Sequence, residues 1–115
     1  MSLDYSTLEL LKQQHPAWRL LRSDHAALIV SFVHRVFIEP NVRVMEQADL
    51  TEALEDELYA LRERYGADKF PKSALEYLND WAGNEKGWLR KFYVPGSDEP
   101  RFDLTPAVEK AAAWL

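Results

Sequence analysis

The sequence predicts one α+β domain that is mostly helical and carries a small antiparallel sheet toward its C-terminal end. Apolar residues recur at helical spacing through most of the chain, whereas one stretch near the end alternates between apolar and charged residues. A chain of 115 residues buries roughly two-thirds of the surface that its unfolded form exposes, which is enough for one hydrophobic core.

Residues 1–22 are predicted to form a helical extension in front of the main domain. Ser6 and Glu9 have the spacing of a capping box, so a helix begins here. One face of this helix is apolar and can continue past Pro16. An apolar helical face must be covered, either by its own domain or by a partner, so its residues are the predicted protein interface. These residues are Tyr5, Leu8, Leu11, Trp18 and Leu21.

The next predicted helix is capped by Ser23 or Asp24 and ends at Pro40 and Asn41. Its apolar side chains recur at steps of three, four and one, which predicts a wide buried stripe. The stripe consists of Leu28, Ile29, Phe32, Val33, Val36 and Phe37. Residues 42–45 follow as a short strand.

Two further helices come after this strand. Asp49 and Glu52 repeat the capping-box spacing at the start of the third helix, whose leucines recur every three or four residues up to Gly66. The fourth helix has Pro71 near its first turn and ends at Gly83. Its inward-facing residues are predicted to be Leu75, Leu78 and Trp81.

A hairpin and a final helix complete the chain. The apolar and aromatic stretch "GWLRKFYV" is followed by the turn "PGSDEP" and the short strand "RFDL". The residues expected on the packed side are Leu89, Phe92, Phe102 and Leu104. Those expected to reach water are Arg90, Lys91 and Arg101. Thr105 with Pro106 then starts the last helix.

The order helix, strand, helix, helix, hairpin is that of a winged helix, and residues 23–104 supply each part in sequence. We therefore expect residues 42–45 to pair with the hairpin as a third strand. Residues 1–22 are extra N-terminal helices. Residues 105–115 are the start of a helix after the wing that leads into further chain, because no capping residue ends it. The alternative is a generic helical domain with an added hairpin.

The composition argues against an enzyme. There are no cysteines, which excludes thiol catalysis and cysteine-based metal sites. The few glycines form neither a phosphate-binding loop nor a G-x-S-x-G nucleophile elbow. His25 and His34 are not three or four residues apart, so they do not form a ligand pair on one helix. We predict no catalytic residue, no cofactor and no metal.

A winged helix can contact DNA or protein, and the charges favour protein. DNA is usually read by the helix before the wing. Here the chain has a net charge of -5, and Asp98 and Glu99 lie at the tip of the hairpin, where a DNA-contacting wing carries Lys or Arg. Weak, nonspecific DNA contact is the alternative. The basic residues that can make it are Lys86, Arg90, Lys91 and Arg101.

Several stretches resemble the N-terminal part of the JetA/MksF family. They are "LDYSTLELLKQQHPAWRLLRSDHA", "LEDELYALRERYG", "FPKSALEYLNDWA" and the segment from "KGWLRKFY" to the end. The family comprises MukF-like kleisin subunits of Wadjet-type SMC complexes, which are condensin-like and defend bacteria against plasmids. The resemblance implies a winged-helix domain of a longer protein, used for protein contacts and kleisin dimerisation, with no catalytic motif.

The resemblance also implies partners. They are a second copy of the chain and, through the full-length protein, the SMC ATPase and an accessory kleisin-binding subunit. No membrane contact is expected, because no stretch approaches the ~20 apolar residues of a span and the N-terminus lacks a signal-peptide pattern. The expected location is the cytoplasm, in association with the nucleoid.

Overall fold

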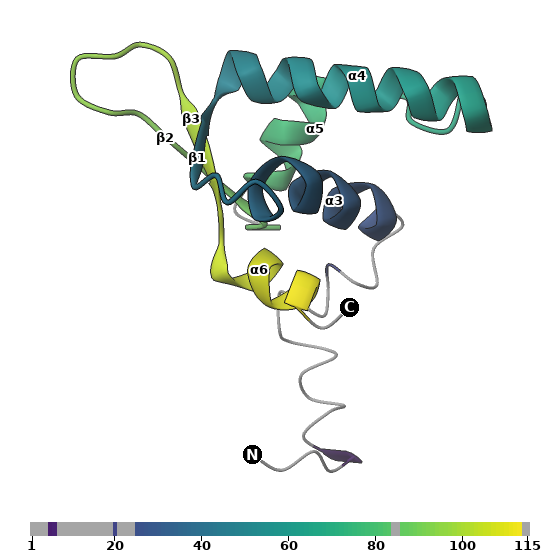
Figure 1. Cartoon of the computed structure of the whole chain (residues 1–115), viewed down its shortest axis with the longest axis horizontal. Helices are drawn as coiled ribbons and strands as arrows, with labels where there is room; N and C mark the ends of the chain where they lie inside the picture. Colours follow the sequence, from purple (N-terminus) through teal and green to yellow (C-terminus); the bar gives the residue numbers. More distant parts are fainter. Residues whose placement is uncertain (1–4, 7–19, 21–24, 84–85, 114–115) are drawn as a thin grey trace.

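The computed structural model describes residues 5–6, 20, 25–83 and 86–113. Residues 5–6 and 20 are helical. The elements that follow are α3 (Ala26–Val33), the π-helix η1 (His34–Ile38), β1 (Val44–Glu46), α4 (Gln47–Tyr65), α5 (Ala74–Trp81), β2 (Leu89–Phe92), β3 (Arg101–Leu104) and α6 (Pro106–Ala113). The described part is α+β and mostly helical, as the sequence predicts. Figure 1 shows α3 between α4 and α6.

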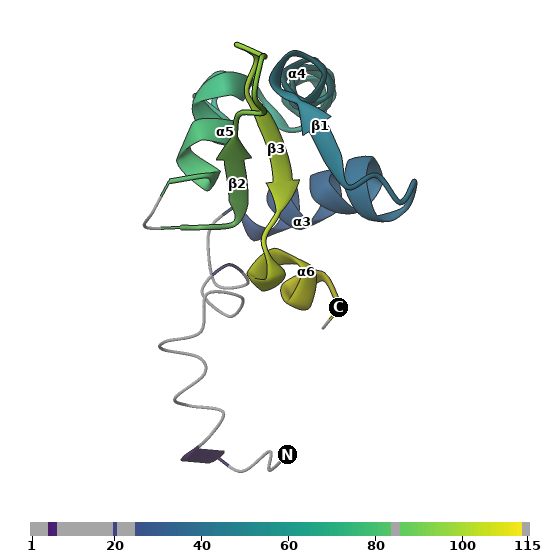
Figure 2. The same cartoon turned by 90° about the vertical axis from the view of Figure 1, so that its left-hand side faces the viewer.

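The strands form one antiparallel sheet in the order β1-β3-β2. Figure 2 shows the sheet nearest the viewer, with α3 and α4 extending away behind it. β1 lies against β3, with Met45 opposite Phe102. The predicted pairing of the short strand with the hairpin is therefore confirmed, although the strand begins at Val44 rather than at residue 42.

The predicted faces of the sheet are exchanged at two neighbouring residues, Lys91 and Phe92. Successive strand residues point to opposite faces, so Phe92, three residues after Leu89, lies on the outer face with its cross-strand neighbour Arg101. The expectation that Phe92 shares the packed side with Leu89 is wrong. Its half-buried ring instead lies under the guanidinium of Arg90, whose Cζ is 4.8 Å from the ring centroid.

The core lies between the inner face of the sheet and the helices. The α3–η1 stripe is buried as predicted, except that Val36 is partly exposed. In α5 the buried residues are Ala74, Tyr77, Leu78 and Trp81, which have one-sided helical spacing. Leu75 is one position off this stripe and is exposed, so its predicted inward orientation is wrong. Leu20 is fully buried in the same core, so the N-terminal extension contributes at least this side chain.

The helix that begins at Ala26 widens into a π-helix before it ends. The N–H of Glu39 donates to the carbonyl of His34 at 2.8 Å, a step of five residues. The chain then leaves the helix through Asn41, which has φ 57. The N–H of Val42 donates to the carbonyl of Phe37 at 2.8 Å, which is the bond of a Schellman motif. The sequence predicted this end of the helix but not the π turn.

The N-terminus of α4 is capped by the hairpin rather than by its own sequence. The helix begins at Gln47, so Asp49 lies inside its first turn and is not the predicted N-cap. Glu99 Oε1 accepts the N–H of Ala48 at 2.9 Å, and the carbonyl of Pro100 accepts the N–H of Gln47 at 2.9 Å. A carboxylate also stabilises the positive end of the helix dipole. The acidic hairpin tip therefore fastens the loop to α4.

Two smaller features fix the hairpin and the last helix. Gly96 has φ 85, a conformation that a glycine after a proline supplies in a type II turn, and the N–H of Ser97 donates to the carbonyl of Val94 at 3.2 Å. At the other end, the hydroxyl of Thr105 donates to the carbonyl of Trp88 at 3.1 Å. This bond ties the start of α6 to the start of β2.

Candidate interaction surfaces

Of the five interface residues predicted in the N-terminal extension, the structure describes one, Tyr5. Tyr5 is helical and its exposed fraction is 80%. Leu8, Leu11, Trp18 and Leu21 lie outside the described residues. Tyr5 therefore has the accessibility that an interface residue needs, and the other assignments stay predictions.

The basic residues of the hairpin all have partners within the domain. Arg90 donates to Asp103 through Nε at 3.0 Å and Nη2 at 2.5 Å, and this bond raises the pKa of Arg90. Arg101 Nη2 lies 3.7 Å from Glu46 Oε1. Both pairs connect adjacent strands, because the partners lie opposite each other in the sheet.

Lys91 is held in another way. Its strand position places it on the inner face, opposite Phe102. From there its Nζ reaches Asn79 Oδ1 of α5 at 3.1 Å. The hairpin residues predicted to contact DNA are thus engaged within the domain, and the charges on the outer face of the sheet are matched pair by pair.

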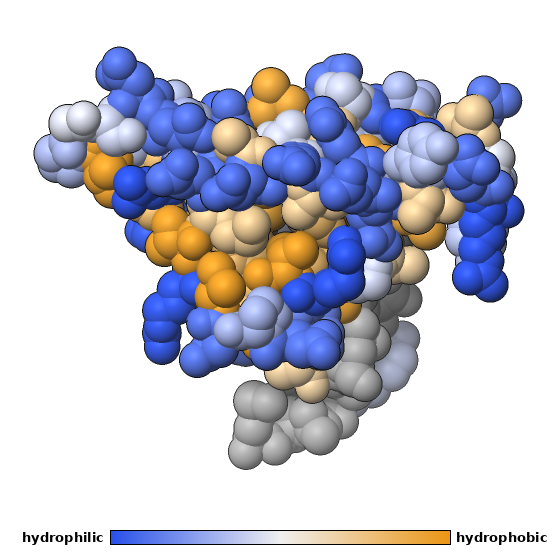
Figure 3. Space-filling model, turned by 45° about the horizontal axis from the view of Figure 1, so that its top comes forward, coloured by the Kyte–Doolittle hydropathy of each residue, from blue (hydrophilic) through white to orange (hydrophobic). Residues whose placement is uncertain are grey.

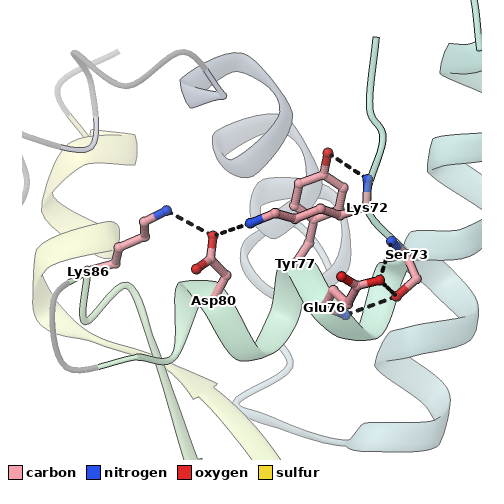
Figure 4. Close-up of polar contacts among 6 residues, drawn as sticks. All are labelled: Lys72, Ser73, Glu76, Tyr77, Asp80 and Lys86. Atoms are coloured by element: carbon pink, nitrogen blue, oxygen red, sulfur yellow. Dashed lines mark hydrogen bonds and ion pairs between the residues drawn. The ribbon is translucent and has the colours of Figure 1, made fainter. Parts of the chain in front are cut away.

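Lys86, the remaining predicted DNA contact, belongs to a different cluster (Figure 4). Its Nζ lies 2.9 Å from Asp80 Oδ2, and Lys72 Nζ lies 3.3 Å from the same oxygen. The hydrogen bond from Lys86 holds the pKa of Asp80 below its usual value, and Lys72 adds to this effect. Lys72 was not among the predicted DNA contacts, and it precedes α5, so no helical spacing links it to Asp80. We call these three residues the lysine cluster.

The backbone around Lys72 is fixed by its neighbours. Arg62 of α4 donates through Nε to the carbonyl of Phe70 at 3.0 Å and through Nη2 to the carbonyl of Lys72 at 2.8 Å. The next residue, Ser73, starts α5 with a capping box, in which its Oγ accepts the N–H of Glu76 at 3.2 Å (Figure 4). Lys72 therefore projects from an anchored loop.

The lysine cluster lies on a cavity of about 350 Å³. Its aromatic lining residues are His25, Tyr77, Trp81 and Trp88. Lys72 Nζ lies 6.0 Å from the ring centroid of Tyr77, and Lys86 Nζ lies 5.5 Å from that of Trp88. The exposed fraction of Trp88 is only 5%. Among the described residues, neither its Nε1 nor His25 Nδ1 has a hydrogen-bond partner.

A larger groove, of about 810 Å³, lies between η1, β1 and α6. Its wall includes hydrophobic side chains that are partly in water: Ile38 is 38% exposed, Val42 37% and Val44 41%. Phe37 and Leu104 also line it. β1 is an edge strand, so no strand of the described sheet covers its outer side. Figure 3 shows hydrophobic residues exposed on one face of the molecule and bordered by hydrophilic ones.

Two kinds of feature are absent from the same described residues. No three His, Asp or Glu side chains among them gather as a metal ion would require. None of the helices in these ranges combines the length and the apolar character needed to cross a bilayer.

Comparisons with known proteins relate the chain to longer ones. A profile of the family described as "Protein of unknown function (DUF3375)" matches residues 10–115. A relative from Mycolicibacterium smegmatis, described as an uncharacterized protein, is 44% identical over 113 residues, which cover 98% of this chain and 24% of the relative. The chain thus spans about a quarter of the length of this curated relative.

Proposed function

The chain belongs to the family described as a protein of unknown function (DUF3375), and from this premise we propose that it is a non-catalytic domain for protein interaction and self-association. The observation that carries the proposal is the groove, because Ile38, Val42 and Val44 expose hydrophobic surface along an open strand edge. Exposed apolar surface of this kind marks sites of protein contact.

We assign the domain to the winged-helix class. Support comes from the order of α3, β1, α4, α5 and the β2–β3 hairpin, and from the antiparallel order β1-β3-β2. The helix before the hairpin, α5, would be the DNA-reading helix of a DNA-binding relative. Here the hairpin loop is occupied in capping α4 through Glu99, and the outer sheet charges are matched. These contacts favour a structural role for the hairpin.

A second copy of this chain is the occupant that we propose for the groove. The N-terminal extension carries a predicted apolar face of Tyr5, Leu8 and Leu11, and Tyr5 is exposed. In a two-fold dimer the same patches are used by both chains, so the face of each copy can cover the groove of the other. This arrangement buries both hydrophobic surfaces at once.

The resemblance to JetA/MksF proteins extends the proposal to the whole protein. We place the domain in a kleisin-like subunit of a bacterial condensin-like SMC complex that acts in plasmid defence or chromosome organisation. The SMC ATPase and the accessory subunit would bind the full-length protein, in the cytoplasm and near the nucleoid. The relative's greater length leaves room for these contacts outside the present chain.

The second candidate function is weak, nonspecific DNA contact. The lysine cluster favours it, because Lys72 and Lys86 lie beside α5 and both contact the same carboxylate, that of Asp80. Two positive charges are thus matched by one negative charge. Against it stand the acidic net charge of -5 and the in-domain partners of the hairpin cations. We rank it below the interaction role.

The test compares the molar mass of the wild type with that of Leu8→Asp/Leu11→Asp, measured by light scattering over a range of concentrations. We expect a wild-type dimer and a monomeric variant with nearly unchanged helical circular dichroism. A matched variant, Glu9→Gln/Lys12→Gln, alters neighbouring polar residues and should remain dimeric. A dimeric Asp variant contradicts the role of the extension. A wild type that stays monomeric contradicts self-association itself.

A further inference from the structure

We propose that the cavity beside the lysine cluster binds a carboxylate side chain of an acidic peptide. This inference concerns a surface separate from the groove and does not rest on self-association. It starts from the observation that Lys72 and Lys86 both contact one oxygen, Asp80 Oδ2, at 3.3 and 2.9 Å. Two positive charges are matched by one negative charge, so one positive charge stays uncompensated within the cluster.

Both lysines have N–H donors that the contact with Asp80 does not use. An ammonium group carries three N–H donors, and among the described residues each lysine side chain makes one hydrogen bond, to Asp80. The side chains of Lys72 and Lys86 are 47% and 38% exposed, so a ligand can reach them. A second carboxylate can therefore bridge the two ammonium groups without displacing Asp80.

The wall of the cavity includes a residue with a further donor that lacks a partner. Trp88 lines it and is 5% exposed, and its indole Nε1 has no hydrogen-bond partner among the described residues. A buried donor without a partner costs free energy, so a ligand that supplies an acceptor is stabilised there. Lys86 Nζ lies 5.5 Å from the centroid of the Trp88 ring, which brings the ammonium and the indole to the same part of the cavity.

The surroundings favour a peptide carboxylate over a DNA phosphate. The cavity of about 350 Å³ is lined by aromatic rings and by Ile29 and Pro71, which suit the aliphatic part of a glutamate or aspartate side chain. DNA binding needs several phosphate contacts in a row, whereas Arg90, Lys91 and Arg101 are engaged elsewhere. Asp80 itself shows that a carboxylate fits between these two ammonium groups.

The indole N–H of Trp88 provides the readout. In a 1H–15N NMR spectrum of the wild-type chain, this signal is assigned from its loss in Trp88→Phe. The probe is an end-capped Gly–Glu–Gly peptide, and the neutral control is end-capped Gly–Gln–Gly at the same ionic strength. We expect a saturable shift of the Trp88 indole signal and of the Lys72 and Lys86 amides with the glutamate peptide only.

Variants then test the lysines. Lys72→Met and Lys86→Met keep the aliphatic stem and remove the charge, and each should weaken peptide binding roughly tenfold, as expected for loss of a charge-assisted hydrogen bond. Lys69→Met is the matched control, because Lys69 is exposed and does not line the cavity. Unchanged signals of the other indoles show that a variant is folded.

Several results overturn the inference. One is the absence of a saturable shift at Trp88, Lys72 and Lys86. Another is an equal shift with the glutamine peptide or with sodium chloride alone. Inorganic phosphate or a short DNA duplex that shifts these signals at lower concentration than the glutamate peptide assigns the cavity to phosphate instead. None of these results affects the dimer mass, so the two proposals fail separately.

Discussion

The outer face of the sheet and the groove beside it share β1, but they differ in whether their side chains have partners within the domain. On the outer face, Arg90 and Arg101 each have a carboxylate partner on the adjacent strand. In the groove, Ile38, Val42 and Val44 keep more than a third of their surface in water. The difference indicates that the charges of Arg90 and Arg101 are compensated within the sheet, whereas the groove leaves hydrophobic surface uncovered.

The largest expected effect comes from placing charge in the groove. In a two-fold dimer, Val42→Asp/Val44→Asp removes four partly exposed valines from the contact. We expect the dimer dissociation constant to rise by about 100-fold or more, because each valine has up to ~1 kcal/mol of burial left to gain. Analytical ultracentrifugation measures this change.

Two control variants separate association from folding. Val42→Thr/Val44→Thr keeps the branched shape that a strand prefers, so β1 should persist while association weakens less. Tyr59→Asp places a charge on an exposed aromatic residue outside the groove and should leave the dimer intact. If Tyr59→Asp dissociates the dimer and the valine variants do not, the groove is not the contact.

The second prediction concerns the hairpin tip. Glu99→Ala removes the acceptor for the Ala48 N–H and should lower the free energy of unfolding by about 1 kcal/mol, as loss of a helix cap does. Urea denaturation provides the measurement. Asp98→Ala, at the neighbouring position, should have little effect. If both variants are equally stable, Glu99 does not cap α4 in solution, and the hairpin tip is free to contact a partner.

A smaller, pH-dependent effect is expected at Asp80. Its pKa is lowered in the folded state, chiefly by the hydrogen bond from Lys86. Its stabilising contribution is therefore present above the unfolded pKa of about 4 and is lost as the pH falls through the folded value. Asp80→Asn should be less stable than the wild type at pH 7 by under ~1 kcal/mol, because all three side chains of the cluster are partly exposed to solvent.

Urea unfolding at neutral and acidic pH tests this prediction. The difference between the wild type and Asp80→Asn should shrink as the pH falls below the unfolded pKa of about 4 and through the lowered pKa of folded Asp80. Asp56→Asn, on the exposed side of α4, serves as the control. A difference that stays constant or grows on acidification contradicts the assigned role of Asp80.

The smallest effect is expected on the salt dependence of DNA binding. Arg90→Gln/Arg101→Gln removes cations that already have partners. The salt dependence of any duplex binding, followed by fluorescence anisotropy, should therefore stay nearly constant. Loss of a phosphate contact would reduce the slope by about 0.9 for each arginine. A change of that size would show that the outer face of the sheet contacts DNA, even though its arginines have carboxylate partners.

The sequence predicted the fold well where a residue's spacing decides its surroundings. The buried stripe of α3 and η1, the hairpin and the pairing of the short strand all follow from periodicity and turn chemistry. Local spacing failed at the start of α4, because the acceptor that caps it, Glu99, is 51 residues away. It also failed at Phe92, where a step of three residues reverses the face of the strand.

The surfaces were harder to predict than the fold. A count of cations selected Arg90 and Arg101, but cross-strand carboxylates neutralise them, and only the sheet register reveals those partners. The groove forms where η1, β1 and α6 come together in the fold, and no local sequence pattern predicts that these elements are neighbours. Lys72 was missed for a similar reason, because the fold rather than the sequence brings it to Asp80.

If an apolar surface drives self-association, the mass of the wild-type domain as a function of both concentration and salt is its most direct test. Hydrophobic contact persists when salt screens exposed charges. We predict that light scattering gives a dimer whose mass is the same or larger at 1 M than at 0.1 M sodium chloride. A monomer at every concentration, or a dimer that dissociates in high salt, would contradict the account.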